Sequence, residues 1–442
     1  MRIIPENVKE IMQKLLDSNF EAYIIGGAVR DYLLDKEPHD YDVFTNATGE
    51  QILKIFPAGK VLGGEERQAK ILTVIVDGVE VSQFRKSGDR TETGTDLITH
   101  QSTCDFTINS IAMDINGEIF DKFHGRHDII LRVVRFVGDA NDRIKEDPLR
   151  ILRGIRFWAD FGTFKNMREV INNLDLLDTL PRERIREEFM KILKSKSGIE
   201  NLTCDNIIYK IIPELEKTKG MNGGQHHDEK VDRHMENAFK ESCKITDNTL
   251  LRLACFLHDI GKGYTQSLDE YDEQTHFYEH EMEGCKLMEK RLEELKFSKE
   301  EIKYVTTLIR LHMYSYKTEP GKKSYIKFFN NLENANIPIE DYIMLIYCDN
   351  QGNMSKPRIK FGDFIKGNWL YKKYYEIKYS DEPMTVKDLK IGGKDLIEKF
   401  GLKPGPEIGK ILNMLFTLVM DGEVKNTRAE LLYNVKALVM KE

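Results

Sequence analysis

The chain has 442 residues, 40% of them hydrophobic, and its 66 Lys and Arg face 73 Asp and Glu, for a net charge of −7. This length and hydrophobic content support more than one buried core and exclude a disordered or fibrous chain. The acidic balance excludes non-specific coating of nucleic acid by a uniformly basic surface, so any such site must be local. Six cysteines without a C-x-x-C pair indicate reduced thiols and a cytoplasmic protein. The apolar runs are short and interrupted, so we expect no membrane insertion.

Helix and strand signals are mixed over the first 140 residues. Residues 8–16 have helical periodicity, and the apolar run at residues 22–25 ends in two glycines, which is typical of a strand that leads into a tight turn. Three β-branched runs, at residues 71–76, 79–84 and 108–113, predict further strands, and Asp-Gly and Asn-Gly pairs beside them are hairpin signals. We therefore expect a small mixed or antiparallel sheet with helices packed on it.

Two glycines and two aspartates lie close together in this segment. The backbone amides of Gly26 and Gly27 can approach a phosphate because no Cβ stands in the way. On a strand, Asp40 and Asp42 would share one face, and such a pair suits Mg²⁺ that clamps a triphosphate. Glu80, on a neighbouring predicted strand, is the candidate for a third carboxylate. A lone Asp-x-Asp is more often an ordinary turn or strand edge, but the glycine turn beside it favours the metal site.

Beyond this segment, most of the sequence has the hydrophobic periodicity of amphipathic helices. On one continuous helix, at about 100° per residue, Glu146, Arg150 and Arg153 share a face, and Asp147 lies beside Arg150. An acid next to a forked guanidinium presents an acceptor and donors to the edge of a base. In the alternative interpretation, Asp147 caps the helix before Pro148 and the arginines are surface charge.

Charge is uneven along the helical part. Residues 126–196 hold 16 Lys and Arg against 12 Asp and Glu, a balance of +4 within a chain of −7. This segment is the candidate surface for a polyanion, and an ordinary solvated helix face is the equally weighted alternative.

Histidines and aspartates gather in the second half of the chain around the pair His258-Asp259. These side chains bind ions such as Mn²⁺, Ni²⁺, Fe²⁺ or Mg²⁺, and a bound ion lowers the pKa of water to make a nucleophile. A lone histidine is usually a surface or satisfied core residue, but several in one domain favour a metal centre. The candidates are His227, His234, His258, Asp259, His280, His312 and Asp349.

Five motifs follow one another in the chain: Gly26-Gly27-x-x-Arg30-Asp31, Asp40-x-Asp42, DFTINS at residues 105–110, RFVG at 135–138, and EDPLRILR at 146–153. This order resembles that of class II CCA-adding tRNA nucleotidyltransferases and bacterial poly(A) polymerases, which are related to DNA polymerase beta. The histidine and aspartate pattern resembles the HD phosphohydrolase superfamily. Both occur together in bacterial CCA-adding enzymes that carry an HD domain.

The resemblance implies an α+β fold, in which a small nucleotidyltransferase (polymerase-beta-like) sheet head is followed by an elongated all-α neck, HD body and tail. We expect the head at residues 1–138 and the neck, with its base-recognition helix, at residues 139–222. The HD domain would occupy residues 223–366, and a helical tail that binds tRNA would occupy residues 367–442.

The resemblance also implies template-independent addition of CCA to tRNA 3′ ends from CTP and ATP, by two-metal nucleotidyl transfer with an Asp and Arg protein template. The catalytic, Mg²⁺-binding carboxylates would be Asp40, Asp42 and Glu80. Nucleotide binding would fall to Gly26, Gly27, Arg30, Asp105, Asn109, Asp147, Arg150 and Arg153. In the HD domain, His234, His258, Asp259 and Asp349 would hold a divalent transition metal such as Mn²⁺ or Ni²⁺, with His227, His280 and His312 around them, for phosphohydrolase activity. DNA is not an expected partner, and the sequence predicts no oligomeric state.

The head departs from this family at two places. Relatives usually carry Arg-Arg-Asp where this chain has Thr103-Cys104-Asp105, and loss of one charge-assisted phosphate contact costs about 1.5–3 kcal/mol. Arg85, Lys86 and Arg90 are candidates to compensate. The segment between Arg85 and Thr103 is also shorter than the loop that many CCA-adding enzymes use when they switch to adenine.

These departures keep several alternatives open. A shortened loop is characteristic of enzymes that add only CC. The missing arginines admit an HD metal phosphohydrolase whose head only binds nucleotide. A poly(A) polymerase fits the charge and the HD domain less well, and a non-catalytic RNA-binding scaffold has no reason to keep two metal constellations.

Overall fold

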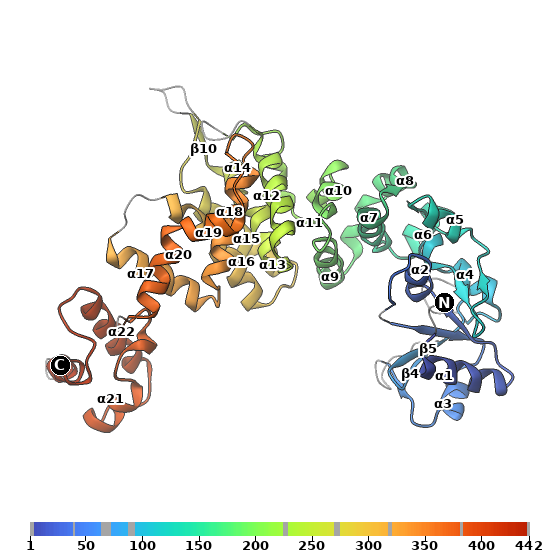
Figure 1. Ribbon diagram of the computed structural model, residues 1–442, viewed down its shortest axis with the longest axis horizontal. Helices are drawn as coiled ribbons and strands as arrows, with labels where there is room; N and C mark the ends of the chain where they lie inside the picture. Colours follow the sequence, from blue (N-terminus) through green and yellow to red (C-terminus); the bar gives the residue numbers. More distant parts are fainter. Residues whose placement is uncertain are drawn as a thin grey trace. The chain divides into compact units, whose positions relative to one another are not determined.

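The computed structural model divides into two compact units, Met1–Ile211 and Ile212–Glu442 (Figure 1). It describes residues 4–38, 40–62, 72–86, 93–223, 229–268, 275–316, 321–380 and 383–439. The first unit combines a sheet with helices, and the second is almost entirely helical. The predicted α+β class, with a small sheet head and a helical remainder, is confirmed.

The first unit is built on a mixed sheet. Its strands, among the described residues, are β1 (Tyr23–Ile25), β2 (Asp42–Thr45), β3 (Lys60–Val61), β4 (Thr73–Val76), β5 (Val79–Gln83), β6 (Ala112–Met113) and β7 (Ile119–Phe120), in the order β3-β4-β5-β2-β1-β6-β7. The pairing between β2 and β5 is parallel, and the other pairings are antiparallel. The central strands β1, β2 and β5 thus bring the glycine turn and the acidic strands side by side.

Helices surround this sheet: α1 (Glu6–Asp17), α2 (Gly27–Leu33), α3 (Gly49–Ile55), α4 (Leu97–Ser102) and α5 (Gly125–Ile130). The predicted helix at residues 8–16 is confirmed as α1, which buries Val8, Ile11, Met12 and Leu15 with the spacing of one helix face. The predicted strand at residues 108–113 is largely wrong. Residues Thr107–Asn109 form a 3-10 turn, and only Ala112–Met113 pair as β6. The Ser110 hydroxyl donates to the Thr107 carbonyl at 2.9 Å, a local bond that competes with a strand.

The rest of the first unit is helical, with one short parallel pair of strands, β8 (Val133–Val134) and β9 (Thr163–Phe164). Its helices are α6 (Ala140–Glu146), α7 (Arg150–Phe161), α8 (Met167–Asn172), α9 (Arg182–Ile192), α10 (Gly198–Cys204) and α11 (Ile208–Ile211). The single helix expected to carry Glu146, Arg150 and Arg153 is wrong, because α6 ends before Asp147 and α7 begins at Arg150. Asp147 is extended, with φ −149° and ψ 98°, as expected for a residue that precedes proline.

An aromatic cluster fixes α7 against the head. The ring of Phe106 lies 4.9 Å from Phe136 and 5.6 Å from Phe157 of α7. Gly154 of α7 faces the same cluster, and a Cβ there would lie 2.3 Å from the ring of Phe164. Close packing at this glycine therefore holds α7 beside the segment that carries Asp105.

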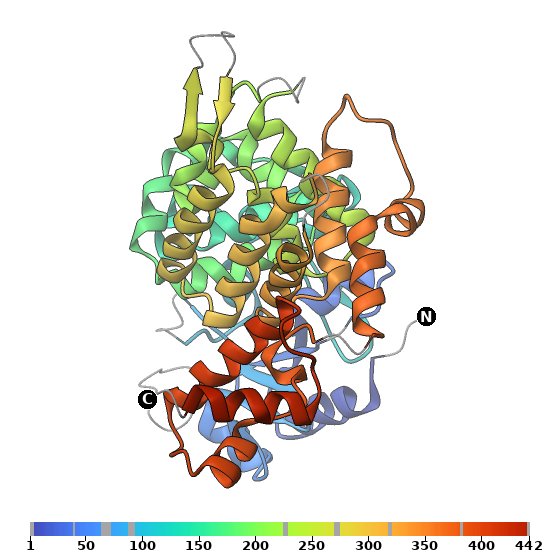
Figure 2. The same cartoon turned by 90° about the vertical axis from the view of Figure 1, so that its left-hand side faces the viewer.

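The second unit begins with a bundle of helices that pack side by side (Figure 2). They are α12 (Val231–Ile245), α13 (Thr249–Leu257), α14 (Lys262–Thr265), α15 (His280–Glu294), α16 (Lys299–Leu311), α17 (Lys322–Asn334), α18 (Ile339–Gly352), α19 (Phe361–Gly367) and α20 (Trp369–Lys378). A short antiparallel pair, β10 (Gln266–Leu268) and β11 (Thr275–Phe277), is an exception to the expected absence of strands. Helices α12, α13 and α18 pack on one another at the centre of the bundle.

The chain ends in three helices with a core of their own: α21 (Gly393–Phe400), α22 (Pro406–Met420) and α23 (Arg428–Val439). Leu396, Leu415, Leu431 and Val435 are fully buried in that core. Across the described part of the chain, every helix is too short or too polar to cross a membrane.

Candidate functional site

The glycine turn joins β1 to α2. Gly26 has a φ of +95°, a conformation that residues with a Cβ rarely adopt, and its amide donates to the Ile111 carbonyl at 3.3 Å. Gly27 is the first residue of α2. The glycines therefore permit the sharp reversal that follows β1 and leave the backbone at this point without a Cβ.

Two predicted carboxylates face each other across the parallel strands. Asp42 is the first residue of β2, and the pairing of β2 with β5 places its Cα opposite that of Glu80. Paired residues of neighbouring strands point to the same face of a sheet, so both carboxylates lie on one face. Carboxylate oxygens in such a group match the donor preference of Mg²⁺.

Asp40 does not share this strand. It is exposed and lies two residues before the start of β2. The paired part of β2 does not include Tyr41 or Asp40, so a shared strand face for Asp40 and Asp42 stays a prediction.

Four predicted nucleotide-binding residues form one hydrogen-bonded network. Arg30 of α2 donates from Nη1 to Oδ1 of Asn109 at 2.7 Å. Asn109 in turn donates from Nδ2 to Oδ1 of Asp105 at 2.9 Å. Arg153 of α7 donates from Nε to Oδ2 of the same carboxylate at 2.7 Å. The network joins the helix after the glycine turn to α7 through the segment between them.

The charge of Asp105 depends on these donors. Burial alone would raise the pKa of Asp105, but the Arg153 guanidinium, the Asn109 amide and the Phe106 N–H together hold the pKa below its usual range. The same pair raises the pKa of Arg153. Asp105 is therefore an ionised carboxylate inside the protein.

Asp147 and Arg150, the predicted base-reading pair, already have protein partners. Arg150 is 5% exposed and donates to Oε2 of Glu146 at 2.8 Å, to the Arg143 carbonyl at 2.9 Å and to the Thr103 carbonyl at 3.2 Å. The Oδ1 atom of Asp147 accepts from the Leu149 amide at 3.2 Å, but the N-cap of α7 is Leu149, so the alternative in which Asp147 caps the helix is not met. The Oδ2 atom of Asp147 accepts from Arg184 of α9 at 2.8 Å.

The Thr103-Cys104 replacement is accommodated in the interior. Thr103 is buried and donates its hydroxyl to the His100 carbonyl at 2.8 Å. Burial raises the pKa of the Cys104 thiol to about 12. Arg85 lies 5.7 Å from the ring of Phe44, and Arg90 falls outside the described residues.

The second candidate site lies in the second unit, where six predicted residues converge from five helices. His234 comes from α12, His258 and Asp259 from the end of α13, His280 from the start of α15, His312 from the end of α16, and Asp349 from α18. All six are at least nine-tenths buried. His227 lies outside the described residues.

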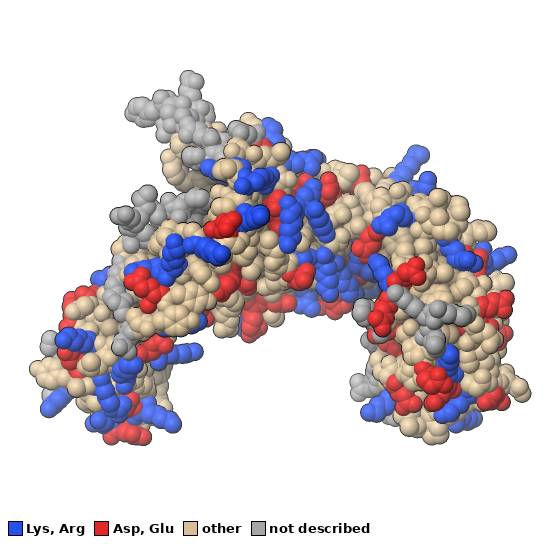
Figure 3. Space-filling model, viewed as in Figure 1, with Lys and Arg blue, Asp and Glu red and all other residues tan. Residues whose placement is uncertain are grey.

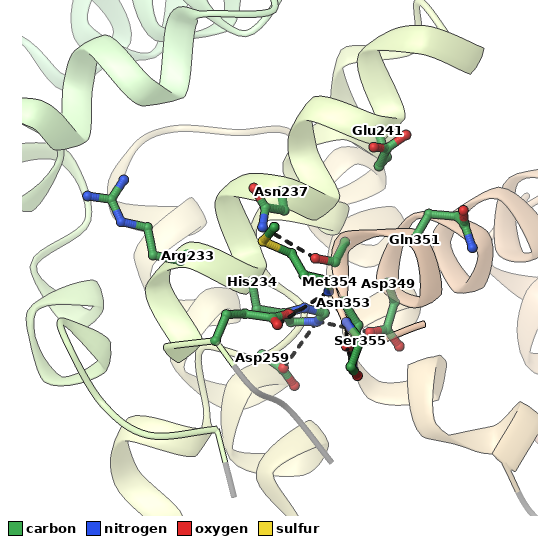
Figure 4. A network of polar contacts seen from close by, with 12 residues as sticks. Arg233, His234, Asn237, Glu241, Asp259, Asp349, Gln351, Asn353, Met354 and Ser355 are labelled. Carbon is green, nitrogen blue, oxygen red and sulfur yellow. Dashed lines mark hydrogen bonds and ion pairs between the residues drawn. The ribbon is translucent and has the colours of Figure 1, made fainter. Parts of the chain in front are cut away.

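The first group of ligand atoms surrounds Nε2 of His234 (Figure 4). This atom lies 3.2 Å from Nε2 of His258, 3.0 Å from Oδ1 of Asp349 and 3.8 Å from Oδ2 of Asp259. Two imidazole nitrogens and two carboxylates at these distances are the donor set of a divalent metal.

A second group shares Asp259 with the first. Its Oδ1 atom lies 3.3 Å from Nε2 of His280 and 3.6 Å from Nε2 of His312, and these two nitrogens are 3.1 Å apart. Because one oxygen of Asp259 faces each group, the arrangement fits two ions bridged by a single carboxylate.

Charged neighbours keep Asp259 ionised. Burial would raise its pKa, but Lys262, whose Nζ lies 2.7 Å from Oδ2, and His258 lower the pKa well below its usual value. Burial would lower the pKa of His258, and Asp259 and Asp349 instead raise it well above the usual value. The two carboxylates of the cluster, Asp259 and Asp349, both have a pKa well below the usual value and are therefore in the charged form that binds a cation.

The outer nitrogens of the histidines fix their orientation. Nδ1 of His258, His280 and His312 lies 2.9, 2.8 and 2.6 Å from the carbonyls of Cys255, Phe277 and Ile309, respectively. Nδ1 of His234 lies 3.1 Å from a carboxylate, that of Glu229.

Sequence analysis missed Glu229, Lys262 and Arg184 as partners of the site. Lys262 follows the His-Asp pair by one helical turn, a spacing that could have identified it. Arg184 reaches Asp147 from a helix 37 residues away, and no local pattern signals such a contact.

Four family models match the chain in order. The poly A polymerase head domain matches residues 22–135, the probable RNA and SrmB-binding site of polymerase A residues 160–218, the HD domain residues 229–346, and tRNA nucleotidyltransferase domain 2 residues 368–435. Each of the two candidate sites lies largely within one of these matches.

Curated relatives match nearly the whole chain. The CCA-adding enzyme of Lactococcus lactis is 28% identical over 98% of this chain and 97% of its own length. The CCA-adding enzyme of Streptococcus pneumoniae is 27% identical over 95% of this chain and 94% of its own.

Solved structures share the fold. The Bacillus stearothermophilus CCA-adding enzyme in complex with CTP superposes with a TM-score of 0.64 at 22% identity and covers 99% of each chain. The Thermotoga maritima CCA-adding enzyme complexed with tRNA gives a TM-score of 0.52 at 18% identity, over 98% of this chain and 94% of that one.

Fold and sites together define a nucleotidyltransferase head joined to an HD domain. The chain combines a poly A polymerase head domain, an HD domain and a tRNA nucleotidyltransferase domain, and it is similar over nearly its whole length to proteins named CCA-adding enzyme.

Proposed function

We propose that this protein adds CCA to the 3′ ends of tRNA from CTP and ATP, without a nucleic-acid template. The single observation that carries the proposal is the network from Arg30 through Asn109 and Asp105 to Arg153. It ties the glycine turn, where a triphosphate would lie, to the helix that begins with the base-reading Arg150. The similarity to relatives named CCA-adding enzyme, which extends over nearly their whole length, supports the same activity.

In the head, Asp42 and Glu80 would hold Mg²⁺, and Asp40, in the segment just before β2, would be the third carboxylate. Bound there, Mg²⁺ supplies neutralisation of the triphosphate and activation of the terminal ribose hydroxyl. The glycine turn leaves room for phosphate oxygens beside the backbone, and Arg30 lies one helical turn further on. These residues bring the hydroxyl of the RNA into line with the α-phosphate, from which pyrophosphate departs.

Base selection is assigned to Asp147 and Arg150. A carboxylate accepts from the amino group of cytosine or adenine, and a guanidinium donates to ring acceptors. Arg150 must exchange at least one of its present bonds, to Glu146 or to the carbonyls of Arg143 and Thr103, for a bond to the base. Fixed partners of this kind hold the guanidinium in place before the nucleotide arrives.

Incubation of the protein with tRNA that lacks its 3′ CCA, labelled CTP or ATP, and Mg²⁺ tests the proposal by sequencing of the products. We expect two C residues followed by one A. D42N should remove incorporation. A neighbouring acid outside the site, Asp35, gives the matched variant D35N, which should retain it.

A second substrate decides between CCA and CC addition. With tRNA that already ends in CC and with ATP, the proposed enzyme adds AMP. Absence of AMP would establish the CC-adding alternative, which rests on the shortened segment between Arg85 and Thr103. Residues 87–92 of that segment fall outside the described part of the chain.

The HD cluster favours a second, metal-dependent phosphohydrolase activity. Five buried ligand residues around the shared carboxylate of Asp259 have the composition of a Mn²⁺ or Ni²⁺ site. The substrate class is a phosphate ester at an RNA end or in a 2′,3′-cyclic nucleotide. Hydrolysis of such esters in the presence of Mn²⁺ or Ni²⁺, and its loss in H258A but not in D42N, tests this assignment.

The tRNA would be bound by local positive charge. Figure 3 shows Lys and Arg interspersed with Asp and Glu over the visible face of both units. Residues 126–196, with their balance of +4, remain the proposed contact segment, together with the tail at residues 367–442. A tRNA substrate also supports the cytoplasm as the site of action.

A further inference from the structure

The outer nitrogen of His234 differs in its partner from those of the other three histidines. In His258, His280 and His312, Nδ1 faces the carbonyl of the residue three positions earlier. His234 lies in the first turn of α12, and its Nδ1 atom faces the carboxylate of Glu229, two residues before the helix begins, at 3.1 Å.

We propose that Glu229 is a positioning residue of the HD metal centre, and that it holds His234 with Nε2 directed at the metal. The inference rests on the metal centre proposed above. Nδ1–H of His234 donates to Oε1 of Glu229, which leaves the lone pair on Nε2 for the ion. Nε2 of His234 lies 3.0–3.8 Å from the ligand atoms of His258, Asp259 and Asp349, so a rotated ring would remove one ligand from this group.

The carboxylate of Glu229 is itself held in place. Its Oε2 atom accepts from the backbone amide of Met354 at 3.3 Å. Met354 follows α18, the helix of Asp349, and the Asn353 amide donates to the Asp349 carbonyl at 3.3 Å. Figure 4 shows His234 and Asp349 beside the Asn353–Ser355 turn. Glu229 therefore joins the two segments that deliver these ligands.

This contact makes the two groups of ligands unequal. The His234 group has four ligand residues, and one of its histidines has an outer carboxylate. In the second group, both histidines, His280 and His312, face backbone carbonyls. Loss of an outer partner of a ligating histidine typically costs about 10- to 100-fold in metal affinity. We expect E229A to weaken the His234 group by that factor and to leave the other group unchanged.

Titration of the metal-free, full-length protein with Co²⁺ tests the inference, with calorimetry and the visible absorption of the bound ion as readouts. H234A identifies the binding step that belongs to the His234 group. E229A should weaken that step about 10- to 100-fold and change its absorption spectrum. E229Q keeps an oxygen acceptor for Nδ1–H and should restore most of the affinity. If E229A does not fold, the comparison of E229Q with the wild type tests the role of Glu229, because E229Q should show a smaller but measurable loss of Co²⁺ affinity.

Glu281 provides the matched control. Its Oε2 atom lies 3.8 Å from Nδ1 of His280, but that nitrogen bonds the Phe277 carbonyl at 2.8 Å. E281A should bind Co²⁺ as the wild type does. Wild-type affinity in E229A, or equal losses in E229A and E281A, would overturn the role of Glu229. A wild-type protein that binds no Co²⁺ would refute the metal centre itself, and the inference with it.

Discussion

Asp105 connects parts of the head that are remote in sequence. Its two oxygens accept from Asn109, from the Phe106 amide and from Arg153, 48 residues further along the chain. A buried carboxylate is stable in its charged form only while such donors are present. The state of this one side chain therefore reports whether the head and α7 are correctly assembled.

Substitution of Asp105 by asparagine should destabilise the protein and impair nucleotide addition. The amide cannot neutralise Arg153, so we expect a loss of about 1–3 kcal/mol in the free energy of unfolding at pH 7. Urea unfolding of the unit Met1–Ile211 measures this loss of free energy. D175N, at a 93% exposed position, should leave the free energy nearly unchanged.

The same pair predicts a dependence on pH. The pKa of Asp105 is lower in the folded than in the unfolded chain, where it is about 3.9. Its stabilising contribution is therefore complete above the unfolded value and is lost as the pH falls through the folded value. Wild type and D105N should differ at pH 7 and converge in acid. A difference that persists unchanged to pH 2 would contradict the ion pair.

The thiol of Cys104 should be chemically inert. Burial raises its pKa to about 12, so the reactive thiolate is scarce at pH 8. Cys204 is exposed and serves as the internal comparison. Mass spectrometry after brief treatment with iodoacetamide should find label on Cys204 and none on Cys104. Label on both at similar rates would show that Cys104 is accessible.

At the scale of elements, α7 depends on one glycine for its position. A methyl group at Gly154 would lie 2.3 Å from the Phe164 ring and 3.3 Å from Phe106, so G154A must displace either the rings or the helix. We expect a loss of about 1–3 kcal/mol in stability and a further loss of nucleotide addition, because Arg150 and Arg153 move with α7. Thermal unfolding and incorporation assays measure the two effects.

The control for this substitution is another helical glycine. Gly409 of α22 is exposed and has open space where a Cβ would lie. G409A should stabilise the protein by about 0.5–1 kcal/mol through the higher helix propensity of alanine. Equal destabilisation by both substitutions would show that the Phe164 contact is not the cause.

The sequence predicted the helices and strands better than it predicted where they end and how they contact one another. Runs of β-branched residues predicted β4 and β5. Glu80 was expected to join Asp42 because it lies on a neighbouring predicted strand, and the parallel pairing places the two residues opposite each other. A continuous helix through Asp147 was predicted from spacing alone, although Pro148 already restricted the residue before it. The contacts of Glu229 with His234 and of Arg184 with Asp147 depend on tertiary packing, which periodicity does not encode.

At the scale of the whole molecule, the two units carry separate cores and separate candidate metal sites. A ligand that binds only the folded state stabilises the unit that holds it. We therefore expect two calorimetric transitions, of which only one, that of Ile212–Glu442, rises when Ni²⁺ is added and falls when a chelator removes the ion. H258A should remove this response and leave the other transition in place. An equal rise of both transition temperatures on addition of the metal would contradict a metal site confined to the second unit.

The parallel pair in an otherwise antiparallel sheet has a consequence for variation in this family. Because β2 and β5 run in the same direction, the chain between them must cross over, and α3, β3 and β4 form that connection. The register of Asp42 with Glu80 is set by hydrogen bonds between the two strands and not by the length of the crossover. Homologues can therefore gain or lose residues between positions 46 and 78 while the two carboxylates keep their spacing, so this connection is where insertions should accumulate without loss of catalysis.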